Sequence, residues 1–221
     1  MCGRFAINVP IDAMARLFAA RPANDLPPVP NYNVCPTNRI HVVRGSDTGR
    51  QLVGMRWGFL PYWYKSETDG PLLINARAET LADKPAFRAA CRERRCIVVA
   101  SGFYEWHKTP EGRRLPWYIY RRDGAPMALG GIWQNWGTDH PIATCAIVTT
   151  PANAGISSIH SRMPLILEPP DWPLWLGEAG KGAARLMVPA DDEVLGFHRV
   201  STAVNSNRAT GSRLIEPIDA D

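Results

Sequence analysis

The sequence predicts an α+β fold in which a mainly antiparallel, barrel-like sheet dominates and the helices are few and short. The first observation is a series of short runs rich in β-branched and aromatic residues, which is the composition of strands. The second is that helical patterns do not separate these runs at regular intervals, as they do in a doubly wound parallel sheet. The third is that turn residues, 20 Pro and 18 Gly, spread along the whole chain. We therefore expect one domain over residues 1–221.

The chain is expected to begin with a strand followed by a helix. Alternating residue types up to Ile7 predict a strand that fixes the N-terminus within the domain. Pro10 can begin a helix over residues 11–20, whose apolar residues fall on one face, and Pro22 ends it. The proline-rich segment 26–30 suits neither a helix nor a central strand, so we expect an extended surface connection.

The remaining elements follow from composition and from turn and cap signals. Asp83 is a candidate N-cap for a helix over 84–92, and shorter helical stretches are predicted at 152–157 and around 171–176. The predicted strands are 41–44, 52–57, 96–100, 117–120, 127–131, 144–149, 165–167 and 197–200.

Composition excludes several classes of protein. The apolar runs are strand-sized and far short of the ~20 residues that cross a bilayer, and the start of the chain lacks the pattern of a secretory signal. We therefore expect a cytoplasmic monomer whose five cysteines are thiols, with no metal and no cofactor. The net charge of +4 is too small for a general nucleic-acid footprint, so any DNA binding must be local.

Cys2 is the first candidate for chemistry. Removal of Met1 would give one residue that carries both an α-amine and a thiol. The amine titrates near ~8 and the thiol near ~8.5, so a fraction of each is nucleophilic at neutral pH. The alternative is an incidental cysteine in a frayed terminus, although Gly3, Arg4 and Phe5 do not have the composition of a disordered tail.

Glu105 and His160 are candidate proton-transfer groups. Glu105 lies between two aromatic residues at the end of a hydrophobic strand, where burial would raise its carboxyl pKa towards the working pH. A solvated edge glutamate is the equally acceptable alternative. His160 lies two residues before Arg162 and could share a strand face with it, while a lone histidine is more often structural.

Two further segments suit binding. Asn75, Arg77 and Glu79 alternate, so they lie on one face if the segment is extended, although a solvated strand face has the same pattern. Trp63 and Tyr64 lie in an aromatic-rich loop followed by polar residues. Exposed aromatic rings there could stack on single-stranded bases, whereas many aromatic residues in a small barrel simply fill its core.

Taken in order, these segments resemble the SOS response-associated peptidase (SRAP) family. The resemblance covers the chain from its first residues to near Pro217. The segments that carry it are MCGRF at 1–5, YNVCPT at 32–37, WG at 57–58, NARAET at 75–80, GFYEW at 102–106, HSRMP at 160–164 and VN at 204–205. It implies a cytosolic protein that recognises abasic sites in single-stranded DNA and traps them covalently through its N-terminal cysteine.

The resemblance also implies roles for individual residues. Cys2 would be the crosslinking nucleophile, Asn75 would position its amine, and Glu105 would act as acid and base. His160 would assist sugar opening and reversal. The residues implied in DNA binding are Arg4, Arg77 and Arg162 at phosphates, Thr149 lining the site, and Pro36, Trp63 and Tyr64 wedged against displaced bases.

Two residues depart from the family pattern. Ser161 replaces the acidic residue that commonly follows the histidine, and Cys35 replaces the usual alanine. The first departure bears on the orientation and basicity of His160.

Two other functions are compatible with the residues. One is peptide-bond hydrolysis with Cys2 as an N-terminal nucleophile, including removal of a peptide that precedes it. The other is noncovalent binding of single-stranded DNA, which would not need Cys2. Lyase-type activity at the abasic sugar would accompany the crosslinking function.

Overall fold

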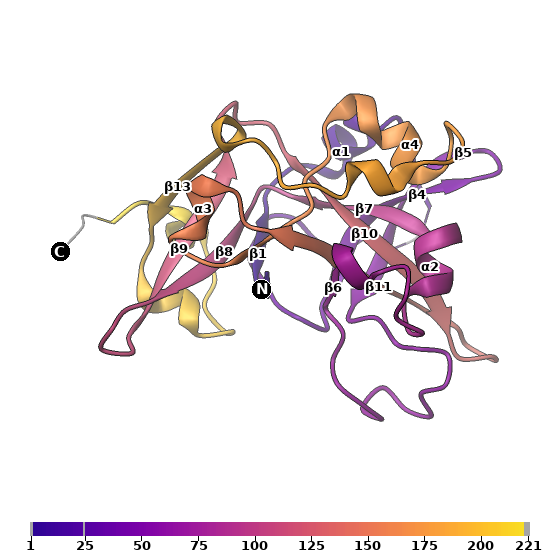
Figure 1. The fold of residues 1–221 in the computed structure, drawn as a ribbon, viewed down its shortest axis with the longest axis horizontal. Helices are drawn as coiled ribbons and strands as arrows, with labels where there is room; N and C mark the ends of the chain where they lie inside the picture. The colour runs from indigo at the N-terminus through magenta and orange to yellow at the C-terminus, as the bar shows by residue number, and fades with distance from the viewer. Residues whose placement is uncertain (1, 24, 219–221) are drawn as a thin grey trace.

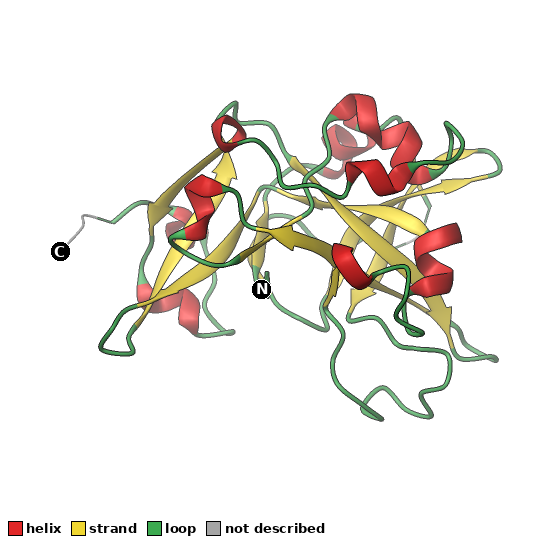
Figure 2. Cartoon of the chain, viewed as in Figure 1, coloured by secondary structure: helices red, strands yellow, loops and turns green. Residues whose placement is uncertain are grey.

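The computed structural model describes residues 2–23 and 25–218. Figure 1 shows two groups of strands with β1 between them, and Figure 2 shows how little of the chain is helical. The strands are β1 Phe5–Ile7, β2 Ala20–Pro22, β3 Asn31–Val34, β4 Arg39–Ser46, β5 Gly49–Trp57, β6 Asn75–Arg77, β7 Arg95–Ala100, β8 Gly102–Lys108, β9 Arg114–Arg121, β10 Met127–Trp136, β11 Ile142–Pro151, β12 Arg162–Pro164 and β13 Leu195–Arg199. The α-helices are α1 Ile11–Leu17, α2 Arg88–Glu93, α3 Ala154–Ser157 and α4 Trp172–Leu176. Short 3₁₀ turns lie at Ala78–Thr80, Pro169–Asp171, Ala183–Leu186, Asp192–Val194, Thr202–Asn205 and Ser212–Ile215.

The larger sheet curls into a closed ring. Its strands follow the order β12-β11-β10-β7-β4-β5-β2 in the described residues, and the neighbours from β11 to β5 pair antiparallel. β11 also pairs parallel with β5, where Thr144 lies opposite Arg56 and Cys145 opposite Trp57. This second pairing joins the two sides of the path, so the predicted barrel-like α+β class is confirmed.

The smaller sheet carries the start of the chain. Its order is β13-β9-β8-β1-β3 in the described residues, and every pairing is antiparallel. β1 lies between β8 and β3, with Phe5 opposite both Phe103 and Val34. The predicted N-terminal strand therefore exists, and hydrogen bonds on both sides fix the backbone just after Cys2.

The side chains of β1 alternate between two buried clusters. Phe5 and Ile7 belong to the main core, which draws apolar residues from both sheets. Ala6 belongs to a smaller cluster that includes Tyr104 and Tyr118. Strand alternation thus makes β1 part of both cores. The main core shared by the two sheets supports the proposal that residues 1–221 form one domain.

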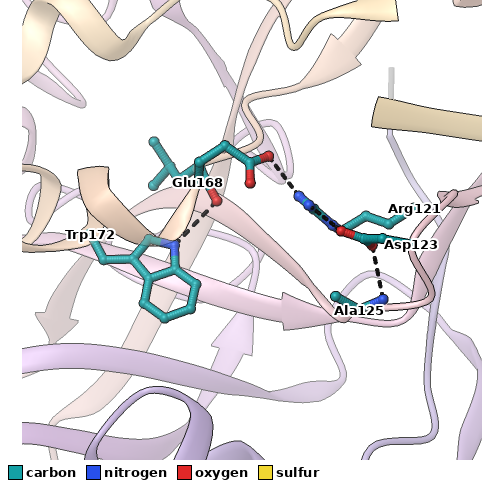
Figure 3. A network of polar contacts seen from close by, with 6 residues as sticks. Arg121, Asp123, Ala125, Glu168 and Trp172 are labelled. Carbon is teal, nitrogen blue, oxygen red and sulfur yellow. Dashed lines mark hydrogen bonds and ion pairs between the residues drawn. The ribbon is translucent and has the colours of Figure 1, made fainter. Parts of the chain in front are cut away.

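A polar network joins the end of β9 to the segment before α4 (Figure 3). Arg121 contacts Asp123 at 2.7 Å and Glu168 at 2.6 Å, and the Asp123 carboxylate also accepts the backbone N–H of Ala125. The Arg121 hydrogen bond lowers the pKa of Asp123 to about 2. Trp172 donates its indole N–H to the Leu167 carbonyl beside this network. These contacts tie the smaller sheet to the helical cover of the larger one.

Most predicted elements are present, and the differences have local causes. The 11–20 helix ends at Leu17, and Ala19 takes a left-handed φ of 47° before β2. The 84–92 helix begins only at Arg88, after turns in which Lys84 N–H bonds the Thr80 carbonyl, and Asp83 does not cap it. The third helix starts at Ala154 because the Asn153 side chain accepts the Ile156 N–H as an N-cap.

The predicted strand at 165–167 is reduced to a single antiparallel bridge between Ile166 and Leu129 of β10. The strand in this region is β12, which pairs with the end of β11. Residues 165–167 are buried and extended, but their backbone bonds go to two different strands. Leu165 N–H bonds Val148 of β11, whereas Leu167 N–H bonds Ala128 of β10. In the described ranges, no helix is long and apolar enough to cross a membrane.

Candidate active site

Cys2 lies at the junction of the two sheets. It is fully buried, and its carbonyl accepts a hydrogen bond of 2.8 Å from Asn75 Nδ2. Asn75 begins β6, which pairs parallel with β11 of the larger sheet, so this contact bridges the sheets. Asn75 Oδ1 is buried and has no hydrogen-bond partner among the described residues. Met1, whose removal would expose the α-amine of Cys2, lies outside the described residues.

Glu105 supplies a buried carboxyl group. It lies in the middle of β8, opposite Trp117 of β9, and its side chain is 3% exposed. The sequence placed it at the end of a hydrophobic strand, whereas β8 is a separate strand after β7. Burial raises the pKa of Glu105, so the protonated form persists to a higher pH than in an ordinary glutamate.

His160 lies beside Glu105, with Nδ1 4.0 Å from Glu105 Oε1. The sequence allowed His160 to share a strand face with Arg162. In the structure His160 lies between α3 and β12, outside any strand, so the two residues share no strand face. Instead, the backbone N–H of Arg162 donates to His160 Nδ1 at 3.0 Å, which fixes the ring. The histidine side chain is 27% exposed. The His160 ring therefore lies between the buried Glu105 carboxyl group and the solvent.

The Cys2 thiol is held in its neutral form. Burial raises its pKa far above the ordinary value, and the nearby charge of Glu105 raises it further. Cys2 Sγ lies 4.0 Å from the carbonyl oxygen of Arg4. Reactive thiolates need an electropositive, partly exposed setting, whereas Cys2 is fully buried and lies near the carboxyl group of Glu105.

Arg162 is already engaged by an acidic side chain. Its guanidinium pairs with both carboxylate oxygens of Glu79, the longer contact being 3.0 Å. It also donates to the Thr149 hydroxyl at 3.1 Å and to the Thr149 carbonyl. We expected Glu79 to share a strand face with Asn75 and Arg77 if this segment was extended. Glu79 instead lies in the 3₁₀ turn after β6, so it is not on that face. The turn instead directs Glu79 to Arg162.

The other two candidate phosphate ligands differ in how firmly they are held. Arg4 Nη1 donates to Asn33 Oδ1 at 2.6 Å and to the Val204 carbonyl at 2.9 Å. Arg77 is exposed, and its side chain makes no hydrogen bond or ion pair within the described part of the chain. Arg4 is thus fixed in place, whereas Arg77 can move to meet a ligand.

The aromatic loop between β5 and β6 projects from the barrel as a long connection (Figure 2). Trp63 is 44% exposed, and its ring packs edge-on against Tyr62, which is 80% exposed. Tyr64 is half-buried because its ring lies against Gly70 and its hydroxyl donates to the Pro71 carbonyl. Tyr62 was not among the predicted binding residues, because residue type alone does not tell which ring of such a run faces solvent.

A hollow of about 580 Å³ lies between this loop and Asn75. Trp63, Asn75 and Arg77 line it together with the apolar residues that precede α2. Pro36 is half-buried just after β3. The structure therefore gathers Cys2, Asn75, Glu105 and His160 in one site, with arginines and an exposed indole around it. Among the described residues, no three His, Cys, Asp or Glu side chains are grouped closely enough to hold a metal ion.

The chain is similar in sequence to several known proteins along almost its whole length. The chain is 34% identical to abasic site processing protein YoaM of Bacillus subtilis, over 98% of each chain. It is 33% identical to abasic site processing protein YedK of Escherichia coli, over 99% of this chain and 100% of the relative. Abasic site processing protein HMCES of Rattus norvegicus is 30% identical over 99% of this chain and 76% of its own length.

Solved structures and a family model complete the comparison. A crystal structure of a Bacteroides thetaiotaomicron protein superposes with a TM-score of 0.85 at 24% identity, covering 98% of this chain and all of that one. This likeness concerns the fold alone. The family model described as SOS response associated peptidase (SRAP) matches residues 1–207, which include every candidate site residue. The chain therefore belongs to the SRAP family.

Proposed function

We propose that this protein captures abasic sites in single-stranded DNA by forming a thiazolidine with Cys2 after removal of Met1. The curated relatives above are named abasic site processing proteins, which supports the substrate. The observation that carries the proposal is the placement of Cys2: its backbone is fixed by Asn75, and the buried carboxyl of Glu105 lies close enough to affect its thiol. A positioned α-amine, a thiol and a protonated acid are the groups that this reaction requires.

The raised thiol pKa determines which nucleophile reacts first. A neutral thiol is a poor nucleophile, whereas an α-amine with a pKa near ~8 has a useful free-base fraction at neutral pH. The amine therefore attacks the C1′ aldehyde of the ring-opened sugar, and the thiol reacts second. Asn75 Oδ1, buried and without a hydrogen-bond partner in the described residues, is an acceptor available to orient that amine.

Proton transfer then follows from the raised pKa of Glu105. Amine addition gives a carbinolamine, and the protonated carboxyl donates to its hydroxyl, which leaves as water. The cysteine sulfur adds to C1′ of the resulting iminium, and its proton returns to the Glu105 carboxylate. The net change is one thiazolidine and one water. The ring closes within one residue, so its effective concentration is high.

The arginines and aromatic residues around the site suit a single strand. Arg4, Arg77 and Arg162 can hold phosphates, with Thr149 fixing Arg162. Pro36, Trp63 and Tyr64 are proposed to wedge against the neighbouring bases, because stacking on aromatic rings is tolerant of sequence. Covalent capture would shield the sugar from β-elimination and strand cleavage.

One denaturing gel tests this function. Wild-type protein mixed with a single-stranded oligonucleotide that carries an aldehydic abasic site should give an SDS- and heat-resistant adduct. Undamaged oligonucleotide should give none. If binding occurs in solution without any adduct, the protein is a noncovalent DNA-binding module. Peptide-bond hydrolysis has less support, because it depends on a thiolate that the buried site disfavours.

His160→Ala should slow adduct formation less than it slows adduct reversal. The ring lies beside Glu105 and is partly exposed, so it is suited to donating a proton to the sugar ring oxygen when the sugar opens and to accepting that proton back when the sugar closes. Two time courses measure this: adduct appearance with excess protein, and adduct loss after addition of a competing abasic strand. If the rate of adduct loss is unchanged in the variant, the role of His160 is structural.

Glu79→Gln should strengthen binding to intact single-stranded DNA. Glu79 occupies the guanidinium of Arg162, so a neutral glutamine leaves more of that positive charge for a phosphate. The Glu79 side chain is 46% exposed, so the cost in stability should be small, about 0–1 kcal/mol. Fluorescence anisotropy at low salt measures the affinity. Glu178→Gln, which breaks a similar ion pair with Arg50, is the matched control. Equal affinity of both variants would contradict the prediction.

A further inference from the structure

A second hollow lies on the other side of β8 from the reacting groups. Its volume is about 420 Å³, and it is lined by Gly3, Arg4, Trp106, Arg114 and Asn205. Successive side chains of a strand point to opposite faces, so Trp106 and Glu105 face away from each other. Gly3 follows Cys2 directly and has no side chain to close the rim. The hollow therefore begins about one residue from the reacting cysteine, without overlapping the buried carboxyl site.

Trp106 forms a fixed aromatic surface in this hollow. Its indole N–H donates to Asn205 Oδ1 at 2.6 Å, and its inner part packs against the smaller core cluster. The ring itself remains partly exposed. A ring held by a hydrogen bond at one end and by packing at the other loses little freedom when a planar ligand stacks on it.

Two arginines give the hollow a positive charge. Arg4 places its guanidinium 6.0 Å from the Trp106 ring centre, and its Nε is buried with no hydrogen-bond partner among the described residues. Arg114 begins β9, diagonally across the ladder from Trp106, because Pro116 lies opposite Trp106 and Lys108 opposite Arg114. The Arg114 side chain is exposed and makes no ion pair in the described residues. No carboxylate is among the lining residues.

We propose that this hollow is a nucleotide subsite: it holds the nucleotide next to the abasic sugar, with its base on Trp106 and its phosphate on Arg114. The inference rests on the proposed function, because the abasic sugar defines which nucleotide is the neighbour. An aromatic platform beside unneutralised guanidinium groups is the combination that single-stranded nucleic acids bind. The hollow at Trp63 and Arg77 then receives the strand on the other side of the sugar.

Stacking on Trp106 can be tested with oligonucleotides that cannot react. The probe is a fluorescein-labelled single strand with one internal tetrahydrofuran, a stable abasic analogue without an aldehyde. Companion strands lack the base at the next position on the 5′ or the 3′ side. Loss of the base that stacks on Trp106 should lower the affinity of the wild type by roughly 5- to 150-fold, the range that base–aromatic stacking supplies. Trp106→Leu should bind weakly and show no further loss when that base is absent.

Arg114 is tested by salt dependence. Arg114→Gln should weaken binding and reduce the slope of log affinity against log salt by about 0.7, the value for one phosphate contact on a single strand. Arg113→Gln removes the same charge one residue earlier, outside the lining of the hollow, and is the matched control. If the two variants change the slope equally, Arg114 acts only through the general field, and the phosphate assignment is overturned.

Two further measurements keep the test decisive. Trp106→Phe retains an apolar ring if Trp106→Leu fails to fold, and it should keep a reduced dependence on the neighbouring base. An undiminished dependence in folded Trp106→Leu would overturn the stacking assignment. The gel assay with aldehydic DNA is scored separately on wild-type protein. Its failure would reject covalent capture, whereas a normal adduct together with unchanged binding by the Trp106 and Arg114 variants would reject the subsite alone.

Discussion

Cys2→Ala abolishes the SDS- and heat-resistant adduct with abasic single-stranded DNA, and this is the largest effect expected of any single change. Alanine retains the α-amine once Met1 is removed, so an imine can still form. Without the sulfur the imine has no intramolecular trap and returns to aldehyde and amine in water. The variant should therefore give a DNA adduct only when borohydride reduces the imine, while the wild type needs no reductant.

The control for this experiment is Cys35→Ala. Cys35 is half-buried and lies in the same half of the molecule, and its Sγ contacts the carbonyl of Asn33 at 3.4 Å. It has no α-amine, so its loss should leave the adduct unchanged. Wild-type protein that keeps Met1 should be inactive for the same reason, and intact-mass spectrometry of the active fraction should show that Met1 is absent. A durable adduct formed by Cys2→Ala without reductant would refute ring closure by sulfur.

Local signals in the sequence predicted most of the fold. Strand composition located the cores of β4, β5, β7, β9, β10 and β11, and the Pro10 signal located the start of α1. The closure of the ring is different in kind. It depends on parallel pairing between β11 and β5, whose paired residues Thr144 and Arg56 lie far apart in the chain. Nothing in either segment alone specifies that partner.

The sequence indicated which residues are candidates for the site, but it did not indicate which contacts they make. Cys2, Asn75, Glu105 and His160 stand out through chemistry and through family resemblance, and the structure brings them together. The pairing of Arg162 with Glu79 was not foreseen, because the 3₁₀ turn after β6 takes Glu79 off the expected strand face. The burial of Tyr64, which leaves Tyr62 as the most exposed ring of this loop, depends likewise on how the Tyr64 ring packs against Gly70.

Glu105→Gln slows adduct formation by about 10²–10⁴-fold, the contribution typical of a positioned acid or base. The glutamine keeps the shape of the side chain but cannot donate a proton to the carbinolamine. In the wild type, the rate should fall as pH rises through the raised pKa of Glu105, because the acid form is lost. The variant should lack this fall and keep the rise that comes from deprotonation of the amine. Single-turnover gels across the pH range measure both, with the exposed Glu111→Gln as control.

The same substitution should change stability in a direction that a purely structural glutamate would not. Burial raises the folded-state pKa of Glu105, so the folded protein binds this proton more tightly than the unfolded chain does. The contribution of Glu105 to the free energy of unfolding is therefore greatest below the unfolded carboxyl pKa, and it is lost as pH rises through the raised folded value. Glutamine carries no charge at any pH, so Glu105→Gln should gain stability relative to the wild type between pH ~4 and pH ~8. Urea unfolding at both pH values measures the difference. If Glu105→Gln reacts slowly but is more stable than the wild type at the higher pH, Glu105 is a group buried for catalysis. If the variant is less stable than the wild type at both pH values, the role of Glu105 is to hold the fold.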